Sequence, residues 1–314
     1  MVVWARIWND AARLSFSTAL ALALVSTGCN KQQPSADQTT TQTENANGLA
    51  AKNEAEGGAS NDQKEVPPIV RDIQHQSFET ATRGGDDPPA DSNPPPNVTV
   101  SGKPVYKIYK EVVAQWDSIR FATADGKPIR YSATVETDYG PIEIELRPDL
   151  APNHVRNFVA LARAGYYDDL LFDRICHDEN ELETGKMQVF DSVEAGCPLG
   201  TGEPGKDSIG YWLKPEFPSA ESKVIHEPGV VGACRGNETD TAACRFYITL
   251  CDAPFLDGNF TVFGKITRGL DAVRTIAKQP TREYEEDVSG SLRPDKPIKI
   301  KKVTIHTSVG EAGR

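Results

Sequence analysis

The sequence predicts a mainly β domain, folded as a barrel capped by helices, behind a long N-terminal segment of low complexity. Short apolar runs that alternate with polar residues recur from about residue 130 onward, separated by turn-forming residues, as is typical of successive strands. Two stretches, starting near Pro152 and Leu270, have helical spacing instead. Many short strands with two helices fit a sheet that closes on itself.

The N-terminus has the features of a secretory signal. Arg6 and Arg13 flank the start of a short apolar run that ends in small residues before Cys29. The run is too short to cross a bilayer as a helix, so a cleaved signal over residues 1–28 is favoured over a membrane anchor. Ser26-Thr27-Gly28-Cys29 resembles the bacterial lipobox, whose cysteine is lipidated, although Ser26 replaces the usual branched aliphatic residue. We expect an exported periplasmic or cell-envelope protein, anchored to a membrane by lipid on Cys29; ordinary cleavage without lipid is the alternative.

The chain is acidic, with a formal net charge of −11. Removing the signal, which carries Arg6 and Arg13 against Asp10, leaves the mature chain near −12. No cluster of basic residues offsets this charge, which argues against binding to nucleic acid and against electrostatic docking on anionic lipid. We expect a monomer with a solvated acidic surface.

Two segments precede the main domain. Residues 29–97 are rich in polar and small residues and cannot bury enough apolar surface to offset the entropy of ordering, which predicts a disordered tether. Residues 98–129 are predicted to pack on the domain as an extension. Helical spacing over Val105–Trp116 favours an amphipathic helix there, and a strand over Val98–Lys103 is the alternative.

The main domain is predicted over residues 130–308. Its expected strands are Tyr131–Glu136, Ile142–Leu146, Leu170–Cys176, Val230–Gly232, Phe246–Thr249, Thr261–Lys265 and Ile298–His306. The last of these shifts its alternation at Lys301-Lys302, which predicts a bulge. Pro152 suits the first turn of a helix that Gly165 ends, and a second helix is expected over Leu270–Lys278.

The strand Phe246–Thr249 predicts a binding face. Alternation points Phe246 to the core and Tyr247 to the opposite face. Phe255, Leu256 and Phe260 of the next connection join Tyr247 there. An apolar patch that faces outward beside loops indicates a groove for an apolar side chain.

The cysteines leave two interpretations open. Cys234 and Cys244 bracket one loop between neighbouring strands, and Cys176 and Cys197 bracket another, so each pair is a candidate disulfide in an exported protein. Free buried thiols are the alternative. No spacing of cysteines or histidines matches a zinc site, so no metal is expected.

A set of motifs keeps its order over about 180 residues, the length of one domain. The motifs are T-x-x-G-x-I-x-I-E-L at Thr137–Leu146, A-P-x-x-V-x-N-F at Ala151–Phe158, F-x-R at Phe172–Arg174, A-G-C-P-L-G-T-G-E-P-G at Ala195–Gly205, G-V-V-G-A-C-R at Gly229–Arg235, R-F-Y-I-T at Arg245–Thr249 and F-L-D-G-N-F-T-V-F-G at Phe255–Gly264. This ordered set resembles the cyclophilin family of peptidyl-prolyl cis-trans isomerases. The resemblance implies a closed eight-stranded antiparallel barrel capped by two helices, and an isomerase without a cofactor that assists the folding of proline-containing exported polypeptides.

The resemblance assigns catalysis to Arg174. Rotation about a peptide bond has a barrier of about 18–20 kcal/mol. A guanidinium that donates to the proline nitrogen of the twisted amide lowers this barrier, because its hydrogen bonds strengthen only in that state. The residues implied to contact substrate are Phe172, Glu194, Cys234, Arg235, Arg245, Tyr247, Phe255, Leu256 and Phe260.

Several positions depart from the family pattern. Glu194 replaces a usual glutamine, and a carboxylate there is expected to pair with Arg174, which orients the guanidinium but partly neutralises it. Arg245 and Phe255 replace a common glutamine and tryptophan. Residues 177–192 are expected to form a long acidic connection, in which Met187 and Phe190 are the only candidates for the family's groove methionine and aromatic residue.

These departures keep a second function open: a catalytically weak or inactive module that binds proline-containing segments. Other classes find no support. No Ser-His-Asp arrangement has the context of a hydrolase. The G-x-G-x-x-G pattern at Gly200–Gly205 does not open a helix, so a dinucleotide site is not expected.

Overall fold

The structure is a computed structural model of the chain, and it describes residues 75–90, 92–181, 187–203, 207–218, 224–283 and 292–310. The predicted signal, Cys29 and the predicted tether up to residue 74 lie outside the described residues. Within the described part of the chain, no helix is long and apolar enough to span a membrane.

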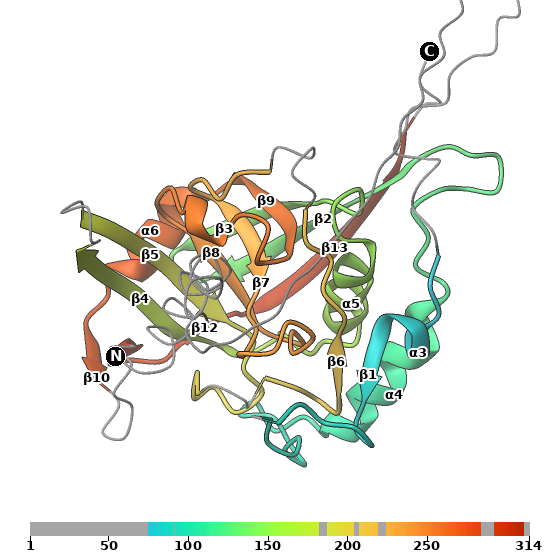
Figure 1. Cartoon of the computed structure of the whole chain (residues 1–314), viewed down its shortest axis with the longest axis horizontal. Helices are drawn as coiled ribbons and strands as arrows, with labels where there is room; N and C mark the ends of the chain where they lie inside the picture. The colour runs from blue at the N-terminus through green and yellow to red at the C-terminus, as the bar shows by residue number, and fades with distance from the viewer. Residues whose placement is uncertain are drawn as a thin grey trace, which may run out of the picture. The chain divides into compact units, whose positions relative to one another are not determined.

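One antiparallel sheet of eleven strands forms the main domain, in the order β10-β11-β4-β5-β8-β7-β9-β3-β2-β13, with β12 paired to β4 (Figure 1). Its strands are β2 (Ile129–Thr137), β3 (Gly140–Leu146), β4 (Leu171–Glu181), β5 (Met187–Ala195), β7 (Val230–Ala233), β8 (Phe246–Thr249), β9 (Val262–Arg268), β10 (Thr281–Glu283), β11 (Leu292–Pro294), β12 (Ile298–Lys299) and β13 (Lys302–Val309). Every strand expected from the apolar alternation is present, and the mainly β class is confirmed.

The predicted closed, eight-stranded barrel is corrected by the strand pairing. β13 pairs with β2 and β12 with β4, but no ladder among the described strands joins β13 to β4. The chain changes partner between β12 and β13, where the Ile300 N–H donates to the Leu170 carbonyl and the Lys301 N–H to the Glu136 carbonyl, both at 2.8 Å. This interruption lies beside the predicted bulge.

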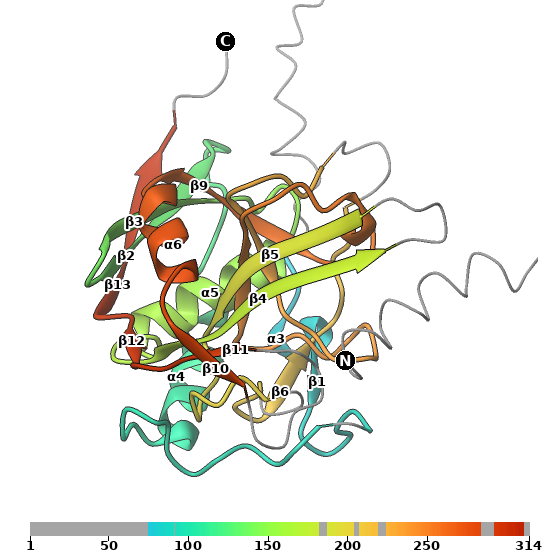
Figure 2. The same ribbon diagram turned by 90° about the vertical axis from the view of Figure 1, so that its left-hand side faces the viewer.

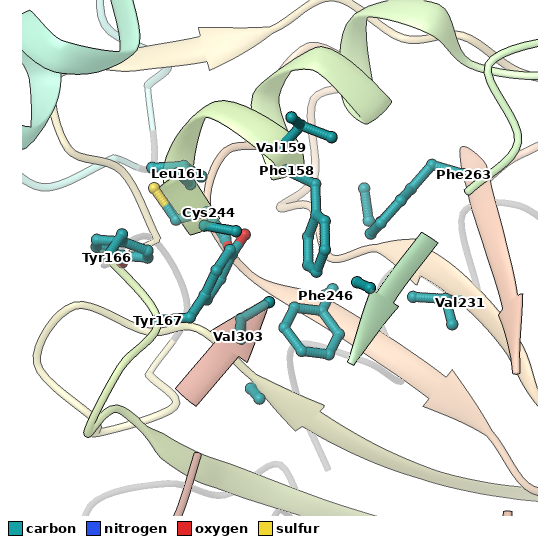
Figure 3. Packing of buried hydrophobic residues seen from close by; sticks show 14 of the residues in the cluster. Phe158, Val159, Leu161, Tyr166, Tyr167, Val231, Cys244, Phe246, Phe263 and Val303 are labelled. Carbon is teal, nitrogen blue, oxygen red and sulfur yellow. The ribbon is translucent and has the colours of Figure 1, made fainter. Parts of the chain in front are cut away.

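Two helices of the main domain lie where the sequence predicts them. α5 (Pro152–Arg163) begins with its proline in the first turn, and Gly165 follows it with φ 68°. α6 (Leu270–Ala277) follows Gly269 and packs against β3. Figure 3 shows Phe158 of α5 above the sheet, with ring centroids 5.7 Å from Phe246 and 5.5 Å from Phe263. These contacts seal one side of the hydrophobic core.

The long acidic connection is also corrected, because most of it is strand. β4 and β5 pair from Phe172↔Ala195 out to Glu181↔Met187 and form one long hairpin (Figure 2). Among the described residues of the outer part, His177, Glu179 and Met187 are exposed, so charged side chains are tolerated there. Backbone hydrogen bonds across the ladder stabilise it despite the low strand propensity of its side chains.

The N-terminal extension starts earlier than predicted. Residues 75–97 belong to the predicted tether, yet α3 (Phe78–Ala81) and β1 (Thr82–Gly84) lie there, and β1 pairs with β6 (Tyr211–Leu213). Phe78 is buried, with ring centroids 5.3 Å from Trp116 and 5.0 Å from Tyr211. The helical alternative for the next segment is confirmed by α4 (Val105–Trp116), whereas Val98 forms only an isolated bridge.

Candidate functional site

Four strands place a row of predicted site residues side by side. In the ladder register, Arg174 on β4 faces Glu194 on β5, Glu194 faces Tyr247 on β8, and Tyr247 faces Gly232 on β7. Directly opposed residues of an antiparallel pair have their side chains on the same face. Because neighbouring strands lie about 4.8 Å apart, the backbones of Arg174 and Tyr247 are about 10 Å apart. The fold therefore brings the predicted guanidinium and the predicted pocket aromatic onto one face of the sheet.

Arg245 holds the acidic groups at one end of this row. Its Nη2 donates to Glu194 Oε2 at 2.6 Å and to Asp173 Oδ1 at 2.8 Å, and its Nη1 donates to Asp207 Oδ1 at 3.1 Å. Arg174 Nη1 is 3.9 Å from the same Glu194 oxygen. The expected pairing of Glu194 with Arg174 is present at this distance, and Arg245 shares the same Glu194 oxygen at a shorter one.

A bulge in β4 explains how two adjacent residues reach this cluster. The register passes from Phe172↔Ala195 to Arg174↔Glu194, so Asp173 is an extra residue on β4. A bulge of this kind turns a side chain that would otherwise point to the opposite face. The Asp173 carboxylate accepts from Arg245 and, through Oδ2, from the Cys197 N–H at 2.9 Å.

The protonation of the cluster follows from burial and charge. Burial raises the pKa of Asp173 to about 6, although Arg245 opposes the shift. Burial would also raise the pKa of Glu194, but Arg174 and Arg245 outweigh it and the pKa is lowered. Burial raises the pKa of Asp207 as well. Glu194 therefore stays ionised, whereas burial favours the protonated forms of Asp173 and Asp207.

Aromatic residues form the other end of the row. The Tyr247 ring makes an edge contact with Phe260 at 6.2 Å between centroids, and the Arg235 guanidinium lies over the Phe260 ring at 4.3 Å. Arg235 also donates to the carbonyls of Asn259 and Gly236, at 3.2 and 3.0 Å. These contacts hold Arg235 over the predicted pocket residues.

The predicted outward-facing patch is corrected by burial. Tyr247, Leu256 and Phe260 are at most 2 % exposed, and Phe255 alone of the four is half-buried. Tyr247, Leu256 and Phe260 lie outside the main hydrophobic core, which confirms the predicted split between Phe246 and Tyr247. Arg235 covers part of this group, which the alternation of the strand alone does not reveal.

The remaining predicted contacts divide between core and rim. Phe172 is part of the hydrophobic core cluster. Phe190 is the candidate aromatic that joins the site, with its ring centroid 5.6 Å from that of Phe255, whereas Met187 is 57 % exposed. Cys234 is buried beside the row, and its N–H donates to the Arg245 carbonyl.

The two candidate disulfides do not form, and the alternative of free thiols holds for all five described cysteines. Cys234 pairs by its backbone with Arg245 rather than with Cys244. Neighbours along an extended chain point to opposite faces, so the two thiols point apart. Cys176 faces Ser192, four residues along β4 from Phe172, which faces Ala195. Cys197 lies beyond Ala195, so about four residues of strand separate the two thiols. At about 3.3 Å per residue, that separation is too long for a disulfide.

Sequence reasoning missed two buried acids of the site, Asp173 and Asp207. It also missed the buried His226. Its Nε2 lies 2.8 Å from the Tyr247 hydroxyl, and its Nδ1 lies 2.7 Å from Asp257 Oδ1. Burial lowers the pKa of His226, although Asp257 opposes the shift, which favours the neutral ring. A buried tyrosine hydroxyl needs a hydrogen-bond partner. Tyr247, predicted on the non-core face of β8, was therefore the feature of the sequence that could have indicated such a residue. The described residues contain no group of side chains suited to a metal ion.

Comparison with known proteins places the chain in a family. The model of the family described as cyclophilin type peptidyl-prolyl cis-trans isomerase/CLD matches residues 132–305. The chain belongs to this family. All the site residues described above lie within the matched range.

Individual relatives agree. The chain is 32 % identical over 178 residues to peptidyl-prolyl cis-trans isomerase-like 3 of Rhizopus delemar, covering 56 % of this chain and 95 % of that protein. It is 35 % identical over 161 residues to a probable peptidyl-prolyl cis-trans isomerase of Brucella suis, covering 51 % of this chain and 76 % of that protein. Against peptidyl-prolyl cis-trans isomerase-like 2 of Rhizopus delemar, it spans only 28 % of the relative's length. A crystal structure of a Cryptosporidium parvum cyclophilin type isomerase matches with a TM-score of 0.44 and 26 % identity, over 56 % of this chain and 98 % of that one.

Proposed function

We propose that the domain over residues 130–308 is a peptidyl-prolyl cis-trans isomerase that acts on X–Pro bonds of proline-containing polypeptides. The observation that carries the proposal is the row Arg174, Glu194, Tyr247 across β4, β5 and β8. It places the backbones of the residues that supply a guanidinium and an aromatic ring about two strand spacings, roughly 10 Å, apart on one face of the sheet. Membership of the family supports the same activity.

Arg174 is the proposed catalytic group. Its guanidinium donates to the proline nitrogen as that nitrogen becomes pyramidal, and so stabilises the twisted amide more than the planar one. Glu194, whose Oε2 lies 3.9 Å from Arg174 Nη1 and is also bound by Arg245 at 2.6 Å, orients the guanidinium for this role. Burial excludes water and strengthens the effect of the charge. The arrangement needs no metal or cofactor.

One observation favours a second candidate, binding without efficient catalysis. Arg174 is 3 % exposed, and Glu194 and Tyr247 are each 1 % exposed. A substrate reaches these groups only after the residues that cover them move. If that movement is costly, the domain binds proline-containing segments but turns them over slowly.

A protease-coupled prolyl isomerisation assay on the whole chain decides between these candidates. Arg174→Ala is expected to lower kcat/KM by about 10²–10³-fold, the effect of removing one preorganised donor. Arg174→Lys keeps the charge but loses the planar fork, and it tests whether the loss reflects unfolding of a buried site. Arg274→Ala, which removes an exposed arginine paired with Asp271 on α6, is the matched control. A wild-type rate equal to that of the uncatalysed bond, from a protein folded by circular dichroism, would exclude the enzyme.

The proposal extends to location: the protein is exported, and a lipid on Cys29 anchors it as a monomer to a membrane, where it assists the folding of exported chains. The support is the apolar run before Ser26-Thr27-Gly28-Cys29 and the acidic composition, which leaves no basic patch for lipid headgroups. Metabolic labelling with radioactive palmitate tests it against a Cys29→Ala variant. Label of equal strength in both proteins would contradict the lipid anchor.

A further inference from the structure

His226 joins two parts of the site that are distant in sequence. Its Nε2 lies 2.8 Å from the hydroxyl of Tyr247 on β8, and the two rings are stacked with an interplanar angle of 22°. On its other side, His226 makes contacts with the 253–257 segment. Its N–H donates to Asp257 Oδ1 at 2.9 Å, and its carbonyl accepts from the Ala253 N–H at 2.7 Å.

These contacts fix the direction of each hydrogen bond. Asp257 is 30 % exposed at its side chain and accepts from the Nδ1–H of His226, because a carboxylate is an acceptor only. A neutral imidazole then has one acceptor left, Nε2, and the Tyr247 O–H donates to it. The chain Tyr247, His226, Asp257 is therefore complete with a neutral ring and leaves no donor or acceptor of the imidazole unused.

The hydrogen-bonded chain of Tyr247, His226 and Asp257 positions side chains that are predicted to surround the proline ring. Tyr247 forms the floor of that pocket, and Leu256 and Phe260 follow Ala253 in the segment that His226 binds. Tyr247 has room to reach His226 because the facing residue is glycine: a Cβ at Gly232 would lie 2.2 Å from the Tyr247 hydroxyl oxygen. The ring of Tyr247 thus lies across Gly232, with its hydroxyl held at the far end.

We propose that His226 is a positioning residue for the proline pocket, holding the floor at Tyr247 and the wall at residues 253–260 in one fixed arrangement. The inference rests on the proposed function for its substrate, a proline-containing peptide. His226 does not contact the reacting amide in this role. It acts through Tyr247 and Asp257, so it contributes to binding the ring in the planar and twisted states alike, whereas Arg174 acts on the twisted state alone.

The test compares three substitutions by their pattern of hydrogen bonding. His226→Gln keeps one donor and one acceptor, as a neutral imidazole does, whereas His226→Phe keeps the ring and removes both. Tyr247→Phe removes the hydroxyl alone. His75→Phe is the matched control, because His75 also lies 2.7 Å from an aspartate, Asp117, in the extension. For each variant we would measure kcat and KM, and the Kd of an uncleaved proline peptide by titration calorimetry.

We expect His226→Phe and Tyr247→Phe each to raise KM and Kd by roughly 2–10-fold with kcat nearly unchanged, the range of one net hydrogen bond. His226→Gln should retain most of the affinity. The double variant His226→Phe with Tyr247→Phe should be no weaker than His226→Phe alone, because both changes break the same chain. Additive losses, or equal losses for Gln and Phe at position 226, would overturn the proposal.

The same measurements separate this inference from the proposed function. A wild-type protein that binds the peptide without turnover would reject the isomerase, and the Kd values would still test His226. A wild-type enzyme with normal turnover and unchanged KM and Kd in all His226 variants would reject the positioning role alone. A variant that loses only thermal stability, with unchanged kinetic constants, would also reject it, since a purely structural residue gives that result.

Discussion

The two ends of the row from Arg174 to Tyr247 are both buried, but different forces stabilise them. The charged end brings together Arg174 and Arg245 with the carboxyls of Asp173, Glu194 and Asp207. With every carboxyl ionised, this end carries one more negative than positive charge. The burial of unbalanced charge is costly, and the raised pKa of Asp173 is its consequence.

The aromatic end avoids this cost. There, each hydrogen bond of the chain Tyr247, His226, Asp257 has one donor and one acceptor, and the charge of that chain lies on the partly exposed Asp257. The comparison shows two ways to fix side chains near one reacting bond. The charged end depends on a single residue, Arg245, that contacts three acids, whereas the aromatic end depends on shape and on the space above Gly232.

Removal of Arg245 is expected to cause the largest loss of unfolding free energy at either end of the row. Arg245→Met leaves Asp173, Glu194 and Asp207 buried without their shared partner, which is expected to cost about 3–5 kcal/mol of unfolding free energy. Arg268→Met is the control, since Arg268 pairs with Glu143 on the surface with its side chain 77 % exposed, and such an exposed pair contributes little to stability. Urea unfolding of both variants measures the difference. Equal losses would show that burial does not set the strength of the Arg245 contacts.

A change of pH alters the stability of the charged end through the titration of Asp173. The pKa of Asp173 rises from 3.8 to about 6 on folding, so between those values the folded state binds more protons than the unfolded state. Stability from this group is therefore full below pH 3.8 and falls as the pH rises to about 6, by about 3 kcal/mol for two units of pKa. Asp173→Asn lacks this titration.

The unfolding free energy of the Asp173→Asn variant, relative to that of wild type, should therefore increase by about 3 kcal/mol from pH 4 to pH 7. Urea unfolding of both proteins across that range is the measurement. The aromatic end gives a slope of the opposite sign, because burial lowers the pKa of His226 and the neutral ring is favoured as the pH rises. A difference between the two proteins that stays constant with pH would contradict the raised pKa of Asp173.

The same contrast explains what the sequence predicts well. Strand β8 matches its predicted bounds, because a short apolar run with period two has one arrangement in a sheet. That alternation also separates Phe246 in the core from Tyr247 on the site face. Local pattern and family motifs therefore locate Arg174 and Tyr247 and the strands that hold them.

Partner choice is what the sequence leaves undetermined. Arg245 contacts acids that are 38, 51 and 72 residues away, and only the bulge at Asp173 and the strand register bring them together. Phe78 shows the same limit in the extension. The residues around it are polar, so a tether is expected, and its order depends on the distant rings of Trp116 and Tyr211. The change of partner between β12 and β13 likewise depends on β4 and β2, which precede them in the chain by more than 100 residues.

Gly232→Ala has the smallest expected effect on unfolding free energy, and it tests the aromatic end by changing its shape alone. The added Cβ would lie 2.2 Å from Cζ and the hydroxyl oxygen of Tyr247, so the ring must move away and its bond to His226 must break. Overpacking of this kind costs roughly 1–3 kcal/mol. Gly84→Ala on β1, where no atom lies within 4 Å of the added Cβ, is the control and should be nearly neutral. Because the charged end is untouched and the released residue, His226, has a lowered pKa when folded, the loss in Gly232→Ala should not decrease as the pH rises from 4 to 7, and urea unfolding across that range checks it. A loss that follows the titration of Asp173 would show instead that the two ends of the row are coupled.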